Sequence, residues 1–374
     1  MTSHPAPSRR TVAKGALLGA AAVLLGASSA GAAQGPPALR LPAPTGPHPV
    51  GLRTFVLTDP SRPDPWVPGA REVMISVLYP ARTVRGFPRV PQLTPAEAKG
   101  FAELAPLVRP GLPAGGVDWG AVLTHGHRDA PPLPGRRPVL LSTPGGGDSR
   151  TLGTTLAEDL ASHGRIVVLV DHPGDASQVE LPGGMRWTVL TGPPDPATFR
   201  TMIDTRVADL RLVVDRLGDL PLAPVMDRSR IGVYGHSAGG TAAVHALAGD
   251  DRISAGVDLE GYLDLDPELV AGLARPLLLF RTDGFEGAAR IESSWAGVRA
   301  RRVVLRRAGH WIFSDYAHLV PQLQAAGLVD AGVRAALVGA GDTRRATAVV
   351  RHGVRSFFDR RLQGAPAPPR SASQ

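Results

Sequence analysis

Short apolar runs recur along the chain from residue 54 onwards, and glycine, proline or charged residues bound each run. Runs of this length are typical of buried strands. Between most of the later runs, apolar residues recur three or four positions apart, as in helices that cover a sheet. This alternation predicts an α/β fold, in which helices cover both faces of a mostly parallel, eight-stranded sheet. The predicted strands are residues 54–57, 73–79, 138–142, 166–171, 231–234, 256–259, 276–280 and 302–305.

The predicted helices lie where connections between parallel strands need them, and they include residues 151–163, 205–217 and 343–362. Their apolar stripes are typical of core packing rather than of a binding surface. Two segments, 81–137 and 173–200, lack regular patterning and are rich in glycine or proline. We interpret both as candidates for a cap or rim over an active site.

The first 33 residues have the pattern of a targeting signal. Arg9, Arg10 and Lys14 precede an apolar run at 16–27, and small residues at 30–32 form a candidate cleavage site. Paired arginines favour export by the twin-arginine pathway to a secreted or cell-envelope location. The run is too short and too rich in alanine and glycine for a stable membrane span, although a retained N-terminal anchor is the alternative.

The composition of the chain excludes some kinds of functional site. The 374 residues contain no cysteine, which excludes disulfides, a thiolate nucleophile and cysteine-based metal sites. The 41 basic residues exceed the 33 acidic ones, but they are dispersed, as on a solvated surface, and do not indicate nucleic-acid binding. The expected organisation is a signal at 1–33, a Pro/Gly-rich linker or extended arm at 34–49, one catalytic domain at 50–362 and a disordered tail at 363–374.

The sequence Gly-His-Ser-Ala-Gly at 235–239 follows a predicted strand and precedes a small, apolar, helix-like stretch. A strand, sharp turn and helix in this order hold a serine in strained geometry with its hydroxyl above the sheet edge. Ser237 is therefore the candidate nucleophile. The amide of Ala238, the next residue, is a candidate donor to an oxyanion. We expect His236 to pack beside the nucleophile.

A serine nucleophile needs an imidazole base and a carboxylate that orients it. His310 follows the last predicted strand, where a loop can bring an imidazole over the serine. Asp258 and Glu260 end the strand after the serine, and Asp283 follows the next one. Glu260 lies nearer the loop than Asp258. Position alone favours Glu260 and Asp283 equally.

The loop at 142–148 follows the predicted strand 138–142 and contains three consecutive glycines. Its Gly146 amide is the candidate second oxyanion donor, and the loop lacks the pattern of a phosphate-binding loop. The sequence His-Gly-His-Arg-Asp at 125–129 is the alternative, because alternate histidine and aspartate residues can bind zinc. Ala130 stands where another histidine would be expected, and two prolines follow. We therefore expect a rim loop there, and neither a metal nor another cofactor.

Four further motifs are specific enough to compare with known families: Ser-Arg-Pro-Asp-Pro-Trp at 61–66, Asp-Leu-Ala-Ser-His-Gly at 159–164, Gly-His-Ser-Ala-Gly-Gly at 235–240 and Gly-His-Trp-Ile-Phe-Ser-Asp-Tyr at 309–316. With these motifs, the chain from about residue 50 to residue 362 resembles the platelet-activating factor acetylhydrolase family, including its exported bacterial esterase and lipase-like members. The resemblance implies serine esterase chemistry on short acyl esters without a metal, with Ser237 as nucleophile and His310 as base. The family's acid motif falls on Glu260, which favours Glu260 over Asp283.

The chain departs from this family in two places. The family usually has aspartate where Glu260 stands, and its eukaryotic members have His-Gly where Pro144 and Gly145 begin the oxyanion loop. The sequence predicts an exported serine ester hydrolase for small esters or lipids, of the short acyl or phospholipid type. A lipase, a cutinase-like polyester hydrolase and a catalytically silent binding protein of the same fold are the alternatives.

Overall fold

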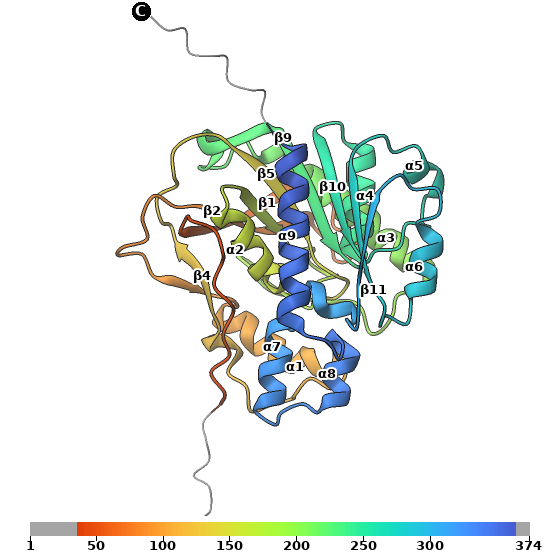
Figure 1. The fold of residues 1–374 in the computed structure, drawn as a ribbon. Coiled ribbons are helices and arrows are strands. Elements are labelled where there is room, and N and C mark those ends of the chain that lie inside the picture. Colours follow the sequence, from red (N-terminus) through yellow and green to blue (C-terminus); the bar gives the residue numbers. More distant parts are fainter. Residues whose placement is uncertain (1–35, 364–374) are drawn as a thin grey trace, which may run out of the picture. The chain divides into compact units, whose positions relative to one another are not determined.

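The computed structural model describes residues 36–363, so the predicted signal at 1–33 and the tail from 364 lie outside the described residues. A ten-stranded sheet, in the order β12-β11-β10-β9-β5-β6-β2-β1-β4-β3, forms the centre of this part (Figure 1). Its strands are β1 (Val50–Pro63), β2 (Ala70–Pro80), β3 (Arg89–Pro91), β4 (Leu123–Arg128), β5 (Arg137–Thr143), β6 (Ile166–Val170), β9 (Met226–His236), β10 (Ile253–Leu259), β11 (Leu277–Thr282) and β12 (Arg301–Leu305).

The sheet confirms the predicted fold class and contains all eight predicted strands. From β12 through β9 and β5 to β6 every pairing is parallel, whereas β2 pairs antiparallel with both β6 and β1. The sheet has ten strands rather than eight because β3 and β4 extend it beyond β1. These two strands carry histidine, arginine, glycine and proline instead of an apolar run, so hydrophobic periodicity did not detect them.

Helices cover both faces of the sheet, as predicted (Figure 1). Leu140 of β5 belongs to the core cluster under α2 (Thr154–Ser162), α7 (Tyr316–Ala325) and α9 (Thr343–Arg361). Its neighbour Leu141 belongs to the cluster under α3 (Pro196–Arg216) and α4 (Ala238–Gly249). This alternation follows from the two-residue period of a strand. The helices are α1 (Pro95–Val108), α2 (Thr154–Ser162), α3 (Pro196–Arg216), α4 (Ala238–Gly249), α5 (Pro267–Ala271), α6 (Ala288–Ser294), α7 (Tyr316–Ala325), α8 (Ala331–Val338) and α9 (Thr343–Arg361), with 3-10 helices η1 (Trp119–Ala121), η2 (Arg150–Gly153), η3 (Ala223–Val225) and η4 (His310–Phe313).

The two segments that lacked regular patterning contain ordered elements. The first holds α1, which begins with a capping box in which the Thr94 side chain accepts from the Glu97 amide and Glu97 accepts from the Thr94 amide. The second holds the antiparallel hairpin of β7 (Gln178–Leu181) and β8 (Gly184–Trp187). Trp187 of the hairpin packs against Gly100 of α1. The Thr-Pro-Ala-Glu sequence at 94–97 was the signal that could have revealed α1.

The proline-rich segment before β1 is an extended arm in its described part, 36–49, and it lies against the domain. Leu39 and Leu41 are buried in the same core cluster as α7. Thr45 donates to Asp159 of α2 from both its amide and its hydroxyl, at 2.9 and 2.7 Å. These contacts attach the arm to the sheet-and-helix domain.

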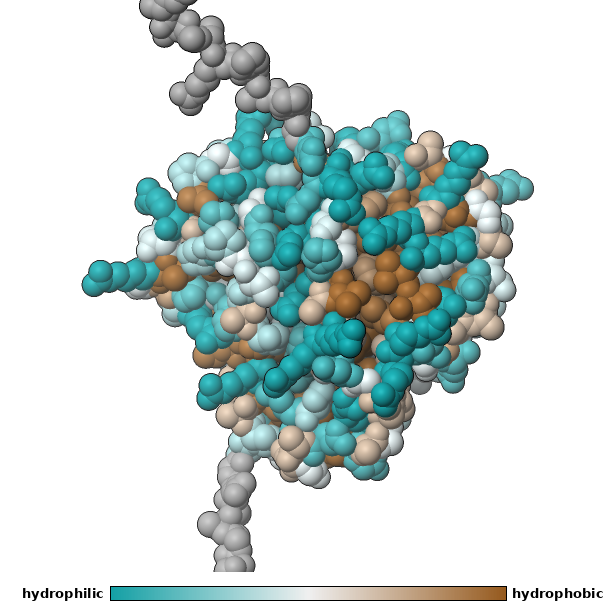
Figure 2. Space-filling view, viewed as in Figure 1, coloured by the Kyte–Doolittle hydropathy of each residue, from teal (hydrophilic) through white to brown (hydrophobic). Residues whose placement is uncertain are grey.

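The face in Figure 2 is mostly hydrophilic, but hydrophobic side chains gather on the β11 side of α9. Val303 of β12 packs against the core cluster that α9 covers, but its side chain is only partly buried. Within residues 36–363, no helix has the length and apolar character that crossing a membrane requires.

Candidate active site

Ser237 occupies the turn between β9 and α4, with φ 55° and ψ −124°. A positive φ is strained for a residue with a side chain, and such strain is typical of a nucleophile held on a tight turn. The flanking glycines allow the turn: a Cβ on Gly235 would lie 2.2 Å from the Gly239 carbonyl oxygen, and one on Gly239 would lie 2.2 Å from the Thr143 oxygen. The serine itself remains partly exposed.

His310 begins η4, directly after the loop that follows β12. Its Nδ1 donates a hydrogen bond of 2.8 Å to Oε2 of Glu260. The other carboxylate oxygen, Oε1, accepts from the Thr282 hydroxyl at 2.8 Å and also from the Thr282 amide. Because Nδ1 carries the proton, the imidazole presents Nε2 as a proton acceptor.

The candidate base, His310, lies against the turn that carries Ser237. His236, immediately before Ser237, donates from Nε2 to the His310 carbonyl oxygen at 2.9 Å, and the two rings are 4.6 Å apart. Phe285 stacks on the other side of the His310 ring at 4.0 Å with an interplanar angle of 17°. His236 therefore packs beside the turn at Ser237 as predicted, and the imidazole of His310 is held between neighbouring rings.

The three candidate acids have different surroundings. Asp258 is fully buried and accepts from the Gly261 amide at 2.6 Å. Asp283 accepts from the Ala308 amide at 3.4 Å, and its side chain is 29% exposed. Only Glu260, among these three, contacts His310. Glu260 also has a positive φ of 66°, so the backbone turns sharply where its side chain reaches the imidazole.

Burial sets the protonation of Glu260 and His310. It raises the pKa of Glu260 to about 7 against the opposing hydrogen bonds from Thr282. Burial, together with the nearby charge of Arg109, lowers the pKa of His310 to about 3. Both shifts disfavour the charged forms. Above about pH 7 the pair therefore consists of a carboxylate and a neutral imidazole that can accept a proton.

The predicted oxyanion loop follows β5 and lies beside the nucleophile turn. A Cβ on Gly146 would be 3.7 Å from the Cβ of Ala238, so these two residues are neighbours. Among residues 36–363, neither the Gly146 amide nor the Ala238 amide donates a hydrogen bond to a backbone or side-chain group. The structure thus brings together both predicted donors, next to Ser237, with free N–H groups of the kind that stabilise an oxyanion.

Arg109, just after α1, supports the loop and was not identified from the sequence. Its Nη2 donates to the Gly146 carbonyl at 3.0 Å and to Asp148 at 2.6 Å. Its guanidinium also lies 3.4 Å from the ring centre of Trp311, the residue after the base. Arg109 therefore connects the oxyanion loop to the base loop, and the segment that carries it showed no regular pattern in the sequence.

The expected rim loop at 125–129 is mostly a strand: both histidines of the alternative metal motif lie on β4, and Asp129 lies at the turn that follows it. His125 contacts the Leu41 carbonyl through Nε2 at 3.1 Å, and Asp129 pairs with Arg53 at 3.2 Å. Within the described part of the chain, no group of three or more histidine or acidic residues is arranged to hold a metal ion. The motif therefore belongs to the strand edge, away from Ser237.

Comparisons with known proteins found relatives whose matches cover more than half of the chain. No family model matches it. A ferulic acid esterase from Streptomyces cinnamoneus, known as a solved structure, is 34% identical with a TM-score of 0.74, and the match covers 90% of this chain and 97% of that one. A probable 1-alkyl-2-acetylglycerophosphocholine esterase from Arthroderma benhamiae is 31% identical over 241 residues, which is 61% of this chain and 60% of that protein.

The platelet-activating factor acetylhydrolase of Canis lupus familiaris is 25% identical over 235 residues, 53% of each chain. This chain therefore spans 53% to 60% of the length of these two curated relatives. The match to the Streptomyces cinnamoneus structure is nearly complete in both directions.

Proposed function

Because the chain belongs to the α/β-hydrolase family that includes the Streptomyces cinnamoneus ferulic acid esterase and the platelet-activating factor acetylhydrolases, we propose that it hydrolyses carboxylic esters with Ser237 as nucleophile. The hydrogen bond from His310 to Glu260, beside a serine with positive φ, supports this proposal most directly. It gives the base the tautomer that accepts a proton from serine.

In the first half of the reaction, Oγ of Ser237 attacks the ester carbonyl while Nε2 of His310 takes the hydroxyl proton. The negative charge that forms on the carbonyl oxygen is stabilised by the amides of Gly146 and Ala238. The tetrahedral intermediate then expels the alcohol, which receives the proton from His310. An acyl-enzyme on Ser237 remains.

In the second half, His310 takes a proton from water, and the resulting hydroxide attacks the acyl carbonyl. The carboxylic acid leaves, and the proton returns to Ser237. Throughout, the carboxylate of Glu260 stabilises the imidazolium and holds its orientation.

Ala238 belongs to an apolar cluster with the buried residues Ile203 and Ala242, and the partly buried Phe199 and Leu265 pack against this cluster. These apolar side chains near the Ala238 amide support an apolar acyl group. Within ester hydrolysis, we propose small acyl or phospholipid-type esters as substrates, and the names of the relatives make an aromatic acyl ester the second candidate.

A panel of p-nitrophenyl esters from acetate to palmitate, with methyl ferulate and a 2-acetyl glycerophosphocholine, tests both proposals. We expect Ser237→Ala to abolish hydrolysis and fluorophosphonate labelling, whereas Ser229→Ala, an exposed serine at the start of β9, keeps both. Hydrolysis that survives Ser237→Ala would rule out the serine mechanism. A folded wild type that hydrolyses no ester and takes no label would instead support the silent binding protein.

The predicted signal supports a second proposal, that the protein is exported through the twin-arginine pathway. The mature N-terminus of the expressed protein, read by mass spectrometry, tests it. We expect cleavage near residue 33, and we expect this cleavage to be lost when Arg9 and Arg10 are replaced by lysine. An intact N-terminus on cytoplasmic protein would contradict it.

A further inference from the structure

From the contacts of the oxyanion loop we infer that Arg206 is a positioning residue, which holds the peptide between Gly145 and Gly146 so that the Gly146 amide faces the reacting carbonyl. This inference rests on the proposed ester hydrolysis. It concerns a residue on α3, outside the nucleophile, base, acid and oxyanion donors.

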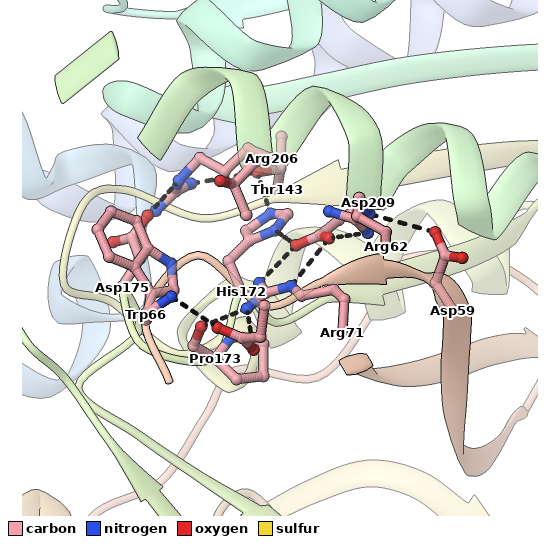
Figure 3. Close-up of polar contacts among 12 residues, drawn as sticks. Asp59, Arg62, Trp66, Arg71, Thr143, His172, Pro173, Asp175, Arg206 and Asp209 are labelled. Carbon is pink, nitrogen blue, oxygen red and sulfur yellow. Dashed lines mark hydrogen bonds and ion pairs between the residues drawn. The ribbon is translucent and has the colours of Figure 1, made fainter. Parts of the chain in front are cut away.

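Arg206 is buried, with 1% of its side chain exposed, and it extends from α3 toward Thr143 at the start of the loop (Figure 3). Its Nη2 donates to the Gly145 carbonyl oxygen at 3.1 Å, and Nη1 donates to the Pro144 carbonyl oxygen and to the Thr143 hydroxyl. One guanidinium thus binds three consecutive residues of the loop.

The direction of the Gly146 amide follows from these bonds. A trans peptide is planar, so the C=O of Gly145 and the N–H of Gly146 point in opposite directions. With the carbonyl turned toward Arg206, the N–H is turned away from it. Glycine on both sides of this peptide leaves its rotation unrestrained by side chains. The orientation of this amide therefore depends on the partner of the Gly145 carbonyl.

The next peptide is held from both sides. Asp175 forms an ion pair with Nε of Arg206 at 2.5 Å, and its other oxygen accepts from the Gly147 amide at 3.1 Å. On the opposite side, Arg109 donates to the Gly146 carbonyl at 3.0 Å. Consequently the groups around the Gly146 amide are all bonded, while the amide itself has no partner among the described residues.

A buried polar chain anchors the start of the loop (Figure 3). The Thr143 hydroxyl donates to Nε2 of His172 at 2.9 Å, and Nδ1 of His172 donates to Asp209 at 2.9 Å. Arg71 binds both oxygens of Asp209, at 3.1 and 2.7 Å. Burial and the charge of Arg206 lower the pKa of His172 to about 4, which keeps it neutral.

Asp209, His172 and Thr143 repeat the order of an acid, an imidazole and a hydroxyl, but Thr143 is only 1% exposed. Substrate cannot reach this hydroxyl, so the three groups act as a support rather than as a second reaction centre. They hold the residue from which the loop begins, and Arg206 donates to the same hydroxyl at 3.2 Å.

The test compares Arg206→Lys, the double variant Arg206→Gln with Asp175→Asn, and the control Arg230→Gln. The double variant removes both charges of the buried pair, so neither is left unpaired. Arg230 pairs with Asp227 at 2.6 Å at the start of β9, the opposite end of that strand from Ser237. All three proteins are checked for folding by thermal unfolding.

We expect the double variant to lower kcat about 100-fold with little change in KM, because the amide acts on the transition state and not on the bound ester. Arg206→Lys retains part of the activity, since an ammonium cannot reach all the acceptors. The inhibition constant of a trifluoromethyl ketone, whose adduct with Ser237 carries an oxyanion, rises in proportion to the fall in kcat/KM. A purely structural role would lower the melting temperature without this proportionality.

Crystal structures of the wild type with and without the ketone test the geometry independently of turnover. The adduct oxygen should accept from the Gly146 and Ala238 amides while the Gly145 carbonyl still faces Arg206. A Gly145 carbonyl that faces the site instead, or a folded double variant with kcat within about twofold of the wild type, overturns the inference. A wild type that shows this geometry and hydrolyses no ester contradicts the proposed function alone.

Discussion

The imidazole of His310 donates a hydrogen bond of 2.8 Å to Glu260, a residue 50 positions earlier in the chain. Thr282, on the neighbouring strand β11, holds the other oxygen of the same carboxylate. The longer acid therefore fits between two fixed partners, one on a strand and one on a loop. A glutamate at this position thus reaches the base directly, where the family usually has aspartate.

Removal of the Glu260 charge should abolish most of the turnover. Glu260→Gln keeps the shape, but the amide oxygen would face the two Thr282 donors and the NH2 group would face His310. Because that NH2 cannot accept from Nδ1, we expect kcat to fall by about 10³-fold to 10⁴-fold. Asp283→Asn is the matched control, because Asp283 contacts Ala308 and Arg306 rather than His310. Steady-state kinetics on a p-nitrophenyl ester measure both. A larger loss with Asp283→Asn would transfer the acid role to Asp283.

The pH dependence of kcat/KM should reflect the same carboxyl group. Because burial raises the pKa of Glu260 to about 7, its carboxylate is present above that pH and is lost as the pH falls through it. We expect activity to rise with pH through about 7. The residual activity of Glu260→Gln should lack this rising limb of the pH profile, since the variant has no carboxyl group at this position to titrate. An unchanged limb in that variant would assign the titration to another group.

A side chain at Gly239 should destabilise the fold. Its Cβ would lie 2.2 Å from the Thr143 carbonyl oxygen and 2.4 Å from that of Pro144, both of which belong to backbone that cannot move freely. We expect Gly239→Ala to reduce the free energy of unfolding by about 3 kcal/mol. Gly249→Ala, at the end of the same helix, meets only the Arg211 side chain at 3.7 Å and should be tolerated. Chemical denaturation compares the two, and equal stability of both variants would contradict the steric argument.

Glu158 should make stability depend on pH in the opposite sense to a paired carboxylate. Burial raises the pKa of this group from 4.5 to about 8, although it accepts from the Gly126 amide at 2.7 Å. The folded state therefore keeps a proton that the unfolded chain releases, and stability falls as the pH rises through this range. Glu158→Gln should remove that part of the fall, whereas Glu103→Gln, an exposed residue of α1, should not. The melting temperatures of the wild type and both variants, measured between about pH 5 and pH 9, provide the test. An identical dependence of melting temperature on pH in all three proteins would contradict this prediction.

The strands and the nucleophile turn could be predicted because their signals are local. Apolar runs marked all eight central strands, and glycines around Ser237 indicated a turn that admits no side chains. The edge strands β3 and β4 could not be found this way. Their residues form no apolar run, and the two strands join the sheet because β1 is already present to pair with β4.

By itself, the sequence determined the fold class, the order of serine, acid and histidine, and the two candidate oxyanion donors. Position in the sequence favoured Glu260 and Asp283 equally as the acid, and only the resemblance to a family favoured Glu260. The contact of Glu260 with His310 was decided by the tertiary structure. So were the bonds of Arg206 to a loop 61 residues earlier in the chain, because hydrogen bonds between such distant residues depend on how helices and strands pack and leave no periodic trace in the sequence.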